Sequence, residues 1–191
     1  MDENKIDQIK ERALAALEGL SPYLTYHSVG HTLDVVRESE RIAREEGISG
    51  ARELFLLKIA AFYHDTGFLI TYAGHEERSC EIFMRDAVHF GLTDQEQEAI
   101  KALIMATRVP QQPCTLLERV ICDADLDYLG RPDFFDIGAR LKQEFLHYKV
   151  VRDEQDWERL QLQFLKNHQY HTVSSQRLRE PVKQSNYQQL L

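Results

Sequence analysis

Two histidines and two aspartates stand where their side chains could share one metal ion. His31 lies in the first turns of an expected helix, His64 and Asp65 close the next helix, and Asp125 closes a later one. Imidazole nitrogens and carboxylate oxygens bind Mn, Fe, Co, Ni and Zn ions, and carboxylates also bind Mg. Four protein ligands on a six-coordinate ion leave about two positions for water and a substrate oxygen. We therefore expect a divalent ion in an open, catalytic arrangement.

The neighbouring pair His64 and Asp65 is the most informative part of this set. Side chains of consecutive helical residues point about 100° apart, so both reach one ion only near a helix end or a distortion. Thr66 and Gly67 follow directly and predict such an end. The turns before the pair are apolar, and a charged Asp65 beside them would be costly without a cation or hydrogen bonds.

The elements that must position these residues are helices. Apolar residues recur at three- and four-residue steps, and glycines, prolines and capping residues separate the runs. The third run is apolar on nearly all sides, which is typical of a central bundle helix, whereas the last is polar and expected on the surface. The expected helices cover about residues 5–20, 27–46, 51–65, 75–90, 93–106, 116–125, 132–148, 154–170 and 173–191.

These helices predict an all-α, single-domain helical bundle over residues 1–191, because no strand-like alternation of useful length is present. The metal-ligand candidates fall in a motif core at about 24–130. A helical extension follows at about 132–191.

The composition argues against several classes of protein. A formal net charge of −8 disfavours a general nucleic-acid-binding surface, because phosphate backbones require clustered cations. No apolar run approaches the roughly 18 residues of a membrane span, and the charged N-terminal segment has no signal-peptide pattern. Three cysteines without CxxC spacing predict reduced thiols, with Cys114 and Cys122 buried. We expect a cytoplasmic protein that binds neither a nucleic-acid duplex nor a membrane, and we allow for a homo-oligomer.

The sequence resembles the HD-domain superfamily of metal-dependent phosphohydrolases in three segments. YHSVGHTLDVV, AAFYHDTGF and DADLDYLG are similar to the first, second and last motifs of that superfamily. Its members are all-helical, so the resemblance implies the fold as well as a metal site. The resemblance implies His31, His64, Asp65 and Asp125 as the metal ligands.

The last motif contains three aspartates, and helical periodicity does not identify which of them is the metal ligand. On an ideal helix Asp123 and Asp127 share a face, and Asp125 points elsewhere. Similarity to the family's Ala-Asp context selects Asp125 as the ligand. Asp123 or Asp127 is then expected to accept a hydrogen bond from a ligating histidine.

His27 is a candidate general acid. It precedes His31 by four residues, so on a helix it would share that face one turn back. The stretch YHSVGH is also similar to the first motif of cyclic-nucleotide phosphodiesterases, and this similarity implies that His27 protonates the leaving oxygen. The alternative is a helix-capping or exposed histidine.

His75, Glu76 and Arg108 are further candidates near the same site. In two-metal members of the superfamily, a histidine at a place comparable to His75 and a later His-Thr pair bind a second ion. Ala106 stands where that pair would begin. We therefore expect one ion rather than two, and a di-iron oxidative enzyme is disfavoured. His75 and Glu76 are expected to contact the ion, a water or the substrate.

Arg108 could contact a phosphate at the mouth of the site. Its alternative is a solvated arginine at a helix C-terminus, where the helix dipole favours a cation.

These observations predict a metal-dependent phosphohydrolase. The ion is expected to activate a bound water and polarise the phosphoryl oxygen, with Asp65 or Asp125 orienting the nucleophile. The expected substrate is a small phosphorylated metabolite, in the first instance a nucleotide, as monoester or diester. The alternative is a regulatory module that binds a nucleotide or a protein partner. An alarmone hydrolase is disfavoured because no Glu-Asp pair follows Asp65.

The remaining prominent side chains are expected to have structural roles. The histidines outside the motifs are expected on the surface or in helix packing, and they are His89, His147, His168 and His171. An apolar stripe at helical spacing is expected to pack helices together, and it comprises Trp157, Leu160, Phe164 and Leu165.

Overall fold

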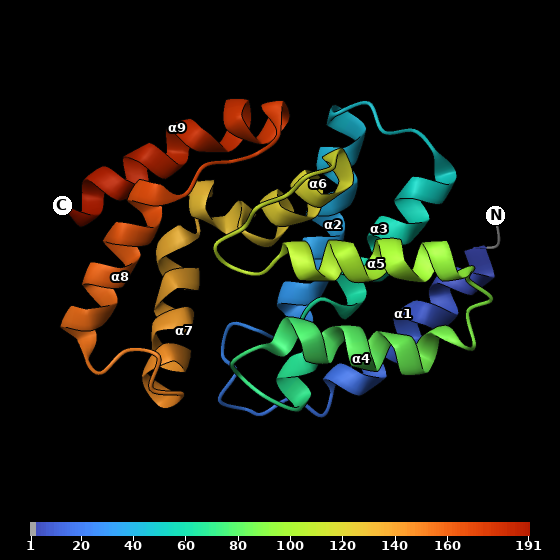
Figure 1. Cartoon of the computed structure of the whole chain (residues 1–191). Coiled ribbons are helices and arrows are strands. Elements are labelled where there is room, and N and C mark those ends of the chain that lie inside the picture. The colour runs from blue at the N-terminus through green and yellow to red at the C-terminus, as the bar shows by residue number, and fades with distance from the viewer. Residues whose placement is uncertain (1–2) are drawn as a thin grey trace.

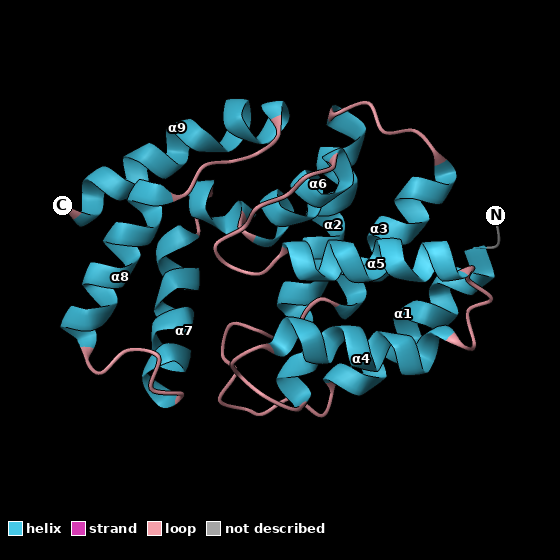
Figure 2. Ribbon diagram, viewed as in Figure 1, coloured by secondary structure: helices cyan, strands magenta, loops and turns pink. Residues whose placement is uncertain are grey.

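The computed structural model describes residues 3–191, and over that range all regular structure is helical (Figures 1 and 2). This confirms the predicted all-α fold class. Residues 1 and 2, which the predicted domain includes, lie outside the described residues. The elements are α1 (Glu3–Leu17), α2 (Val29–Glu45), α3 (Ala51–Tyr63), η1 (Thr66–Leu69), α4 (His75–Ala87), α5 (Asp94–Ala106), α6 (Leu116–Asp125), η2 (Asp127–Gly130), α7 (Phe134–His147), α8 (Glu154–Asn167) and α9 (Val173–Leu190), where η marks a 3-10 helix.

Helix α3 lies at the centre of the N-terminal bundle. It contacts α1, α2, α4, α5 and α6, and Leu57, Ile59 and Ala60 along it are fully buried. Its apolar run therefore has neighbours on several sides, as the sequence predicts. Figure 1 shows α4 and α5 side by side on one face of this bundle. None of the helices in the described range is long and apolar enough to cross a membrane.

Helix α2 begins two residues later than His27. Ser28 is its N-cap in extended backbone, and the Ser28 hydroxyl accepts a hydrogen bond from His31 N. A capping side chain satisfies one of the backbone N–H groups that a helix start leaves unpaired. His27 therefore lies in the loop before the helix, and the expectation that it sits one helical turn before His31 is wrong.

The segment after α3 is held tightly against α4. The Ser79 hydroxyl donates to His64 O at 2.5 Å and accepts from Gly67 N at 2.8 Å. A Cβ on Gly67 would lie 1.8 Å from His75 O, so only glycine fits this approach. The end of α3, η1 and the start of α4 thus form one closely packed corner.

The loop before α6 exposes a cysteine. Thr115 caps α6 together with Glu118, and Cys114 N, one residue before this N-cap, donates to Glu118 Oε2 at 2.6 Å. Cys114 is exposed, whereas Cys80 and Cys122 are buried. The expectation of a buried Cys114 is wrong, because the capping interaction holds it in the loop.

The segment from η2 onward builds a second apolar cluster. Leu129, Phe134, Leu141, Trp157 and Leu165 belong to it. These residues come from η2, α7 and α8, and Figure 1 shows α7 and α8 beside one another, to the left of the N-terminal bundle. Contacts between η2 and α9 connect this cluster to the last helix.

Helix α9 is polar but partly buried, which corrects the expectation of a surface helix. Lys183 is 1% exposed and donates from Nζ to His168 O. Asn186 donates from Nδ2 to Leu129 O at 3.0 Å. A Cβ on Gly130 would lie 2.4 Å from Arg179 O, so glycine lets α9 approach η2 closely. Buried polar side chains are tolerated here because backbone carbonyls satisfy them.

Candidate metal centre

Three helix ends bring the four predicted ligands together. His31 is in the first turn of α2, His64 and Asp65 follow α3, and Asp125 is the last residue of α6. His31 Nε2 lies 3.1 Å from Asp125 Oδ1, 3.3 Å from Asp65 Oδ2 and 3.4 Å from His64 Nε2. His64 Nε2 lies 3.2 Å from Asp65 Oδ2 and 3.5 Å from Asp125 Oδ1.

These separations fit one shared ion. Ligand atoms about 2.1 Å from a metal lie roughly 3.0 Å apart at octahedral angles and roughly 3.4 Å apart at tetrahedral angles. Among the described residues, Asp65 Oδ2 is buried without a well-aligned hydrogen-bond donor, although both imidazole nitrogens lie near it. His31, His64 and Asp65 thus form a cluster that could hold a cation, and Asp125 contacts both rings of that cluster. Two imidazoles with two carboxylates suit a divalent ion.

The electrostatics of the cluster favour a cation. Burial lowers the pKa of His31, but the carboxylates of Asp125 and Asp65 outweigh burial and raise it to about 9. Burial raises the pKa of Asp125, but hydrogen bonds from His31 and His64 outweigh it and lower the pKa to about 2. The pKa of Asp65 is held well below its usual value against its burial, chiefly by the charge of His64. The buried Asp65 and the part-buried Asp125 therefore stay ionised, and without an ion the protonated imidazoles of His31 and His64 balance their charge.

The ring of His64 is oriented by the backbone of its own helix. Its Nδ1 donates to Ala61 O at 2.8 Å, so Nε2 is the ring nitrogen that faces the cluster and would bind an ion after losing its proton. Asp65 follows with a φ of −105° and a ψ of 1°, outside the helical range. That departure from the helix turns the two neighbouring side chains toward one point, as the helix-end prediction requires.

His75, Glu76 and Arg108 line one side of the site. His75 Nε2 lies 3.5 Å from Asp65 Oδ1, and its ring stacks on Phe68 at 3.9 Å between centroids. Glu76 is buried, with Oε2 3.7 Å from His75 Nδ1. Arg108 is half-exposed and pairs with Glu77 at 2.6 Å. These contacts place all three side chains beside the centre, with Arg108 at its rim.

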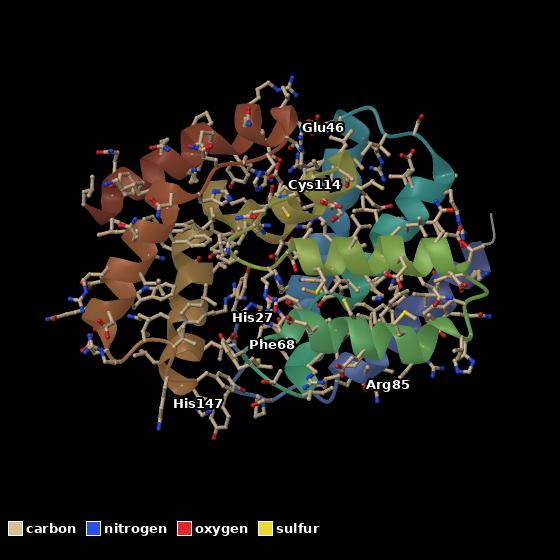
Figure 3. The ribbon with its side chains drawn as sticks, viewed as in Figure 1. His27, Glu46, Phe68, Arg85, Cys114 and His147 are labelled. Carbon is tan, nitrogen blue, oxygen red and sulfur yellow. The ribbon has the colours of Figure 1, made fainter. Side chains whose placement is uncertain are left out.

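His27 reaches the same site from the loop before α2, and a buried glutamate of α7 holds it there. Glu144 is 0% exposed. Its Oε2 accepts from Tyr26 N at 3.0 Å and from His27 N at 3.1 Å, and its Oε1 accepts from His27 Nδ1 and from Tyr72 OH. Figure 3 shows His27 beside Phe68, in the part of the bundle that faces α7.

Sequence reasoning missed Glu144. A signal for it exists, because Ile137, Leu141 and Glu144 share one helical face, and the first two are buried. A glutamate on such a face must have partners to be stable. The identity of those partners, which lie 72 to 118 residues earlier in the chain, follows only from the fold.

A cavity of about 550 Å³ opens from the centre toward the C-terminal helices. His27, Asp65, His75, Arg108 and Asp125 line its polar end. The apolar stripe that the sequence predicts for helix packing, with Trp157, Leu160, Phe164 and Leu165, lines the opposite end. That stripe has a second role as cavity wall, which its spacing alone does not reveal.

Asp123 and Asp127 are engaged away from the centre. Asp123 accepts from His171 N and Thr172 N, both at 2.8 Å, and so holds the start of α9. Asp127 pairs with Arg41 at 2.9 Å and with Arg179 at 2.8 Å. Asp123 also accepts from the Thr172 hydroxyl at 2.6 Å, and Asp127 also lies 3.8 Å from Arg131, so the contacts of both carboxylates among the described residues lead away from the ligating histidines. The expectation that one of them supports a ligating histidine is therefore wrong.

A family model described as HD domain matches residues 29–127, which is more than half of the chain. The chain belongs to the HD-domain family. The match contains all four candidate ligands, from His31 to Asp125, and confirms the family that the three motifs indicate. HD-domain proteins are generally metal-dependent hydrolases that bind divalent ions, which agrees with the cluster of His31, His64 and Asp65.

One solved structure is similar in fold to this chain. The crystal structure of a protein from Lactobacillus plantarum, a structural-genomics target, matches with a TM-score of 0.67. The match covers 98% of this chain and 95% of that chain at 21% sequence identity, so it supports the fold alone. No curated protein matches the sequence.

Proposed function

We propose that this HD-domain protein is a phosphohydrolase in which His31, His64, Asp65 and Asp125 hold a single divalent ion. The observation that carries the proposal is the convergence of these ligands beside His27, with Asp65 and Asp125 at the polar end of the cavity. The substrate is a phosphate ester of a small molecule, with nucleotides as one class to test.

Metal chemistry of this kind supplies a water whose pKa is near neutrality and polarises the phosphoryl oxygen. Asp65 Oδ1 faces His75 and is available to accept a hydrogen bond from the attacking water. His75 Nε2 and the half-exposed guanidinium of Arg108 can donate to the phosphate oxygens. Because the net charge is −8, attraction of an anionic ester must be local, and these cationic groups provide it.

His27 is the proposed general acid. Its Nδ1 is engaged by Glu144, which leaves Nε2 to donate a proton to the leaving oxygen. Burial raises the pKa of Glu144, but the hydrogen bond from His27 outweighs burial and lowers it, so the carboxylate stays ionised. An ionised Glu144 stabilises the protonated imidazole and fixes its orientation.

The residues at the end of α5 favour a single ion. Ala106 offers no ligand atom, and the Thr107 hydroxyl donates to Ile104 O at 2.8 Å. His75 lies beside Asp65, and the nearby His27 ring, 6.2 Å away between centroids, has its Nδ1 engaged by Glu144. The imidazole of His75 alone would provide few ligand atoms for a second ion.

A double substitution tests the proposal. His64→Ala with Asp65→Ala removes one nitrogen and one oxygen ligand and is expected to abolish phosphate release from nucleoside monophosphates and from alkyl phosphates. His89→Ala, an exposed histidine outside the site, is the matched control and should match the unaltered protein. Full phosphate release by the double variant would refute the proposed site. A protein that binds metal yet hydrolyses no ester would favour the regulatory module instead.

A further inference from the structure

The far end of the cavity is apolar, and it is built by the segment after the HD motifs. Its walls there come from η2, α7 and α8, and they include Leu129, Phe134, Leu141, Trp157, Leu160 and Leu165. We call this end the apolar chamber. It belongs to the second apolar cluster and is continuous with the polar end that holds Asp65 and Asp125. Anything bound at the metal centre therefore has apolar space directly beside it.

The apolar chamber offers few polar partners. From the residues of η2, α7 and α8 that line the cavity, the polar side-chain groups are Gln161, the indole N–H of Trp157 and the hydroxyl of Tyr128. Tyr72, nearer the centre, already donates its hydroxyl to Glu144 at 2.8 Å. A nucleobase carries several hydrogen-bonding atoms, and burying them without partners is unfavourable. A hydrocarbon group meets no such penalty and gains from leaving water.

His27 lies in the polar end of the cavity, beside Phe68 and His75. Its ring lies 4.3 Å from the Phe68 ring and 6.2 Å from the His75 ring, between centroids. A phosphate at the metal centre would thus have its ester oxygen next to the proposed acid and its organic group in the apolar chamber. An alkoxide is a poor leaving group, so its departure requires the proton that His27 can supply.

We propose that the substrate is a phosphate monoester of an apolar alcohol, whose hydrocarbon group occupies the apolar chamber. This inference rests on the proposed function. In the reaction, a water oxygen forms a bond to phosphorus and the bond from phosphorus to the ester oxygen breaks. The ester oxygen takes a proton from His27 and leaves as the free alcohol. The water proton passes to solvent, from which His27 regains its own, and inorganic phosphate is the second product.

A binding experiment on the unaltered protein tests the apolar chamber. Trp157 is the only tryptophan in the chain and lines the chamber, so intrinsic fluorescence reports its occupancy. Titration with ethyl, butyl, hexyl and octyl phosphate is expected to lower Kd by about fourfold for each added methylene, until the chamber is full. Nucleoside monophosphates should bind no more tightly than ethyl phosphate, and octanol more weakly than octyl phosphate. A Kd that does not change with chain length would overturn the inference.

A pair of variants locates the binding site. Leu160 lines the chamber and is 39% exposed, whereas Leu178 lies on α9 with 44% exposed and does not line it. Leu160→Glu is expected to raise the Kd of octyl phosphate at least tenfold, because a charge then stands at the chamber wall. Leu178→Glu should bind octyl phosphate like the unaltered protein. Equal binding by the two variants would place the hydrocarbon group elsewhere and overturn the inference.

Phosphate release separates this inference from the proposed function. If kcat/KM for the alkyl phosphates rises with chain length, the proposed function and the inferred substrate class are both supported. Release from nucleotides, together with a flat alkyl series, would keep the proposed function and overturn the substrate class. Chain-length-dependent fluorescence without phosphate release from any ester would overturn the proposed function and the substrate role, while the chamber remains a site for apolar anions.

Discussion

Single hydrogen bonds decide what each histidine of the site can do. His64 Nδ1 donates to Ala61 O and His27 Nδ1 donates to Glu144, so in both rings Nε2 is the nitrogen that remains for the site. The first ring faces two carboxylates and suits a metal, whereas the second lines the cavity beside Phe68 and suits proton transfer. The two histidines therefore take different roles because their Nδ1 atoms have different partners.

The proposed acid predicts a dependence on the leaving group. His27→Ala and Glu144→Gln are expected to reduce kcat on alkyl phosphates by roughly 10²-fold, because an alkoxide must be protonated as it leaves. On p-nitrophenyl phosphate, whose leaving group is a stable anion, both losses should be several times smaller. Steady-state kinetics on the two ester classes measure this difference. Glu154→Gln, at an exposed glutamate of α8, is the control, and equal losses on both classes would argue against an acid role.

His168 predicts a pH dependence of stability. Both of its ring nitrogens are buried without a hydrogen-bond partner among the described residues. Burial, helped by the charge of Lys183, lowers its pKa to about 3. The unfolded chain, with a histidine pKa of about 6.5, then binds more protons than the folded chain between these values. Stability is therefore lost as the pH falls, by up to about 1.4 kcal/mol per pH unit.

His168→Phe is expected to remove this slope, since phenylalanine keeps the ring packing on Phe164. Urea unfolding at pH 7.0, 6.0 and 5.0 measures the difference between the variant and the unaltered protein. His89→Phe changes an exposed histidine and should keep the slope. A parallel pH dependence in the His168 variant and the unaltered protein would mean that another group titrates.

Helices were predictable from the sequence, but their ends and partners were only partly so. The apolar runs predict the elements from α1 to α9, because periodicity is a local property. The two 3-10 helices and the late start of α2 depend on single contacts, such as the Ser28 cap. Of the site, the motifs indicate the four ligands and their neighbours. Glu144 and the apolar chamber arise from contacts between distant segments, which periodicity does not specify.

The corner between α3 and α4 predicts a sensitivity at glycine. Gly67→Ala would bring a Cβ against the His75 carbonyl, and backbone must move to relieve the contact. We expect a loss of roughly 1–3 kcal/mol in stability and a weaker metal affinity, because His64 and Asp65 precede this corner directly. Gly30→Ala in α2, where 3.6 Å separates the new Cβ from Ser28 Oγ, should be tolerated. Chemical unfolding and metal titration would show whether the two variants differ.

At the scale of the whole molecule, buried charges connect the HD core to the C-terminal helices. Asp127 in η2 lies between Arg41 of α2 and Arg179 of α9, and Glu38 accepts from Arg41 at 2.6 Å. Breaking such a pair leaves a buried charge without its partner, so the helices are held as one unit. The organisation of residues 1–191 as a single domain stays a prediction that this network favours.

Coincident unfolding transitions would support that organisation. Trp157 reports the C-terminal helices, and far-UV ellipticity reports all helices. We expect both signals to change at the same urea concentration, because the ion pairs and the contacts of α9 couple the two parts. Two separate midpoints would instead indicate that residues 132–191 unfold independently.

The metal content of two neighbouring variants tests the central claim most directly. Asp125 contacts both imidazoles of the centre, whereas Asp123 holds the start of α9. Elemental analysis should find about one divalent ion per chain in the unaltered protein and in Asp123→Asn, and far less than one in Asp125→Asn. Circular dichroism spectra serve as the control that both variants are folded. Two ions per unaltered chain, or a full ion in Asp125→Asn, would contradict the account.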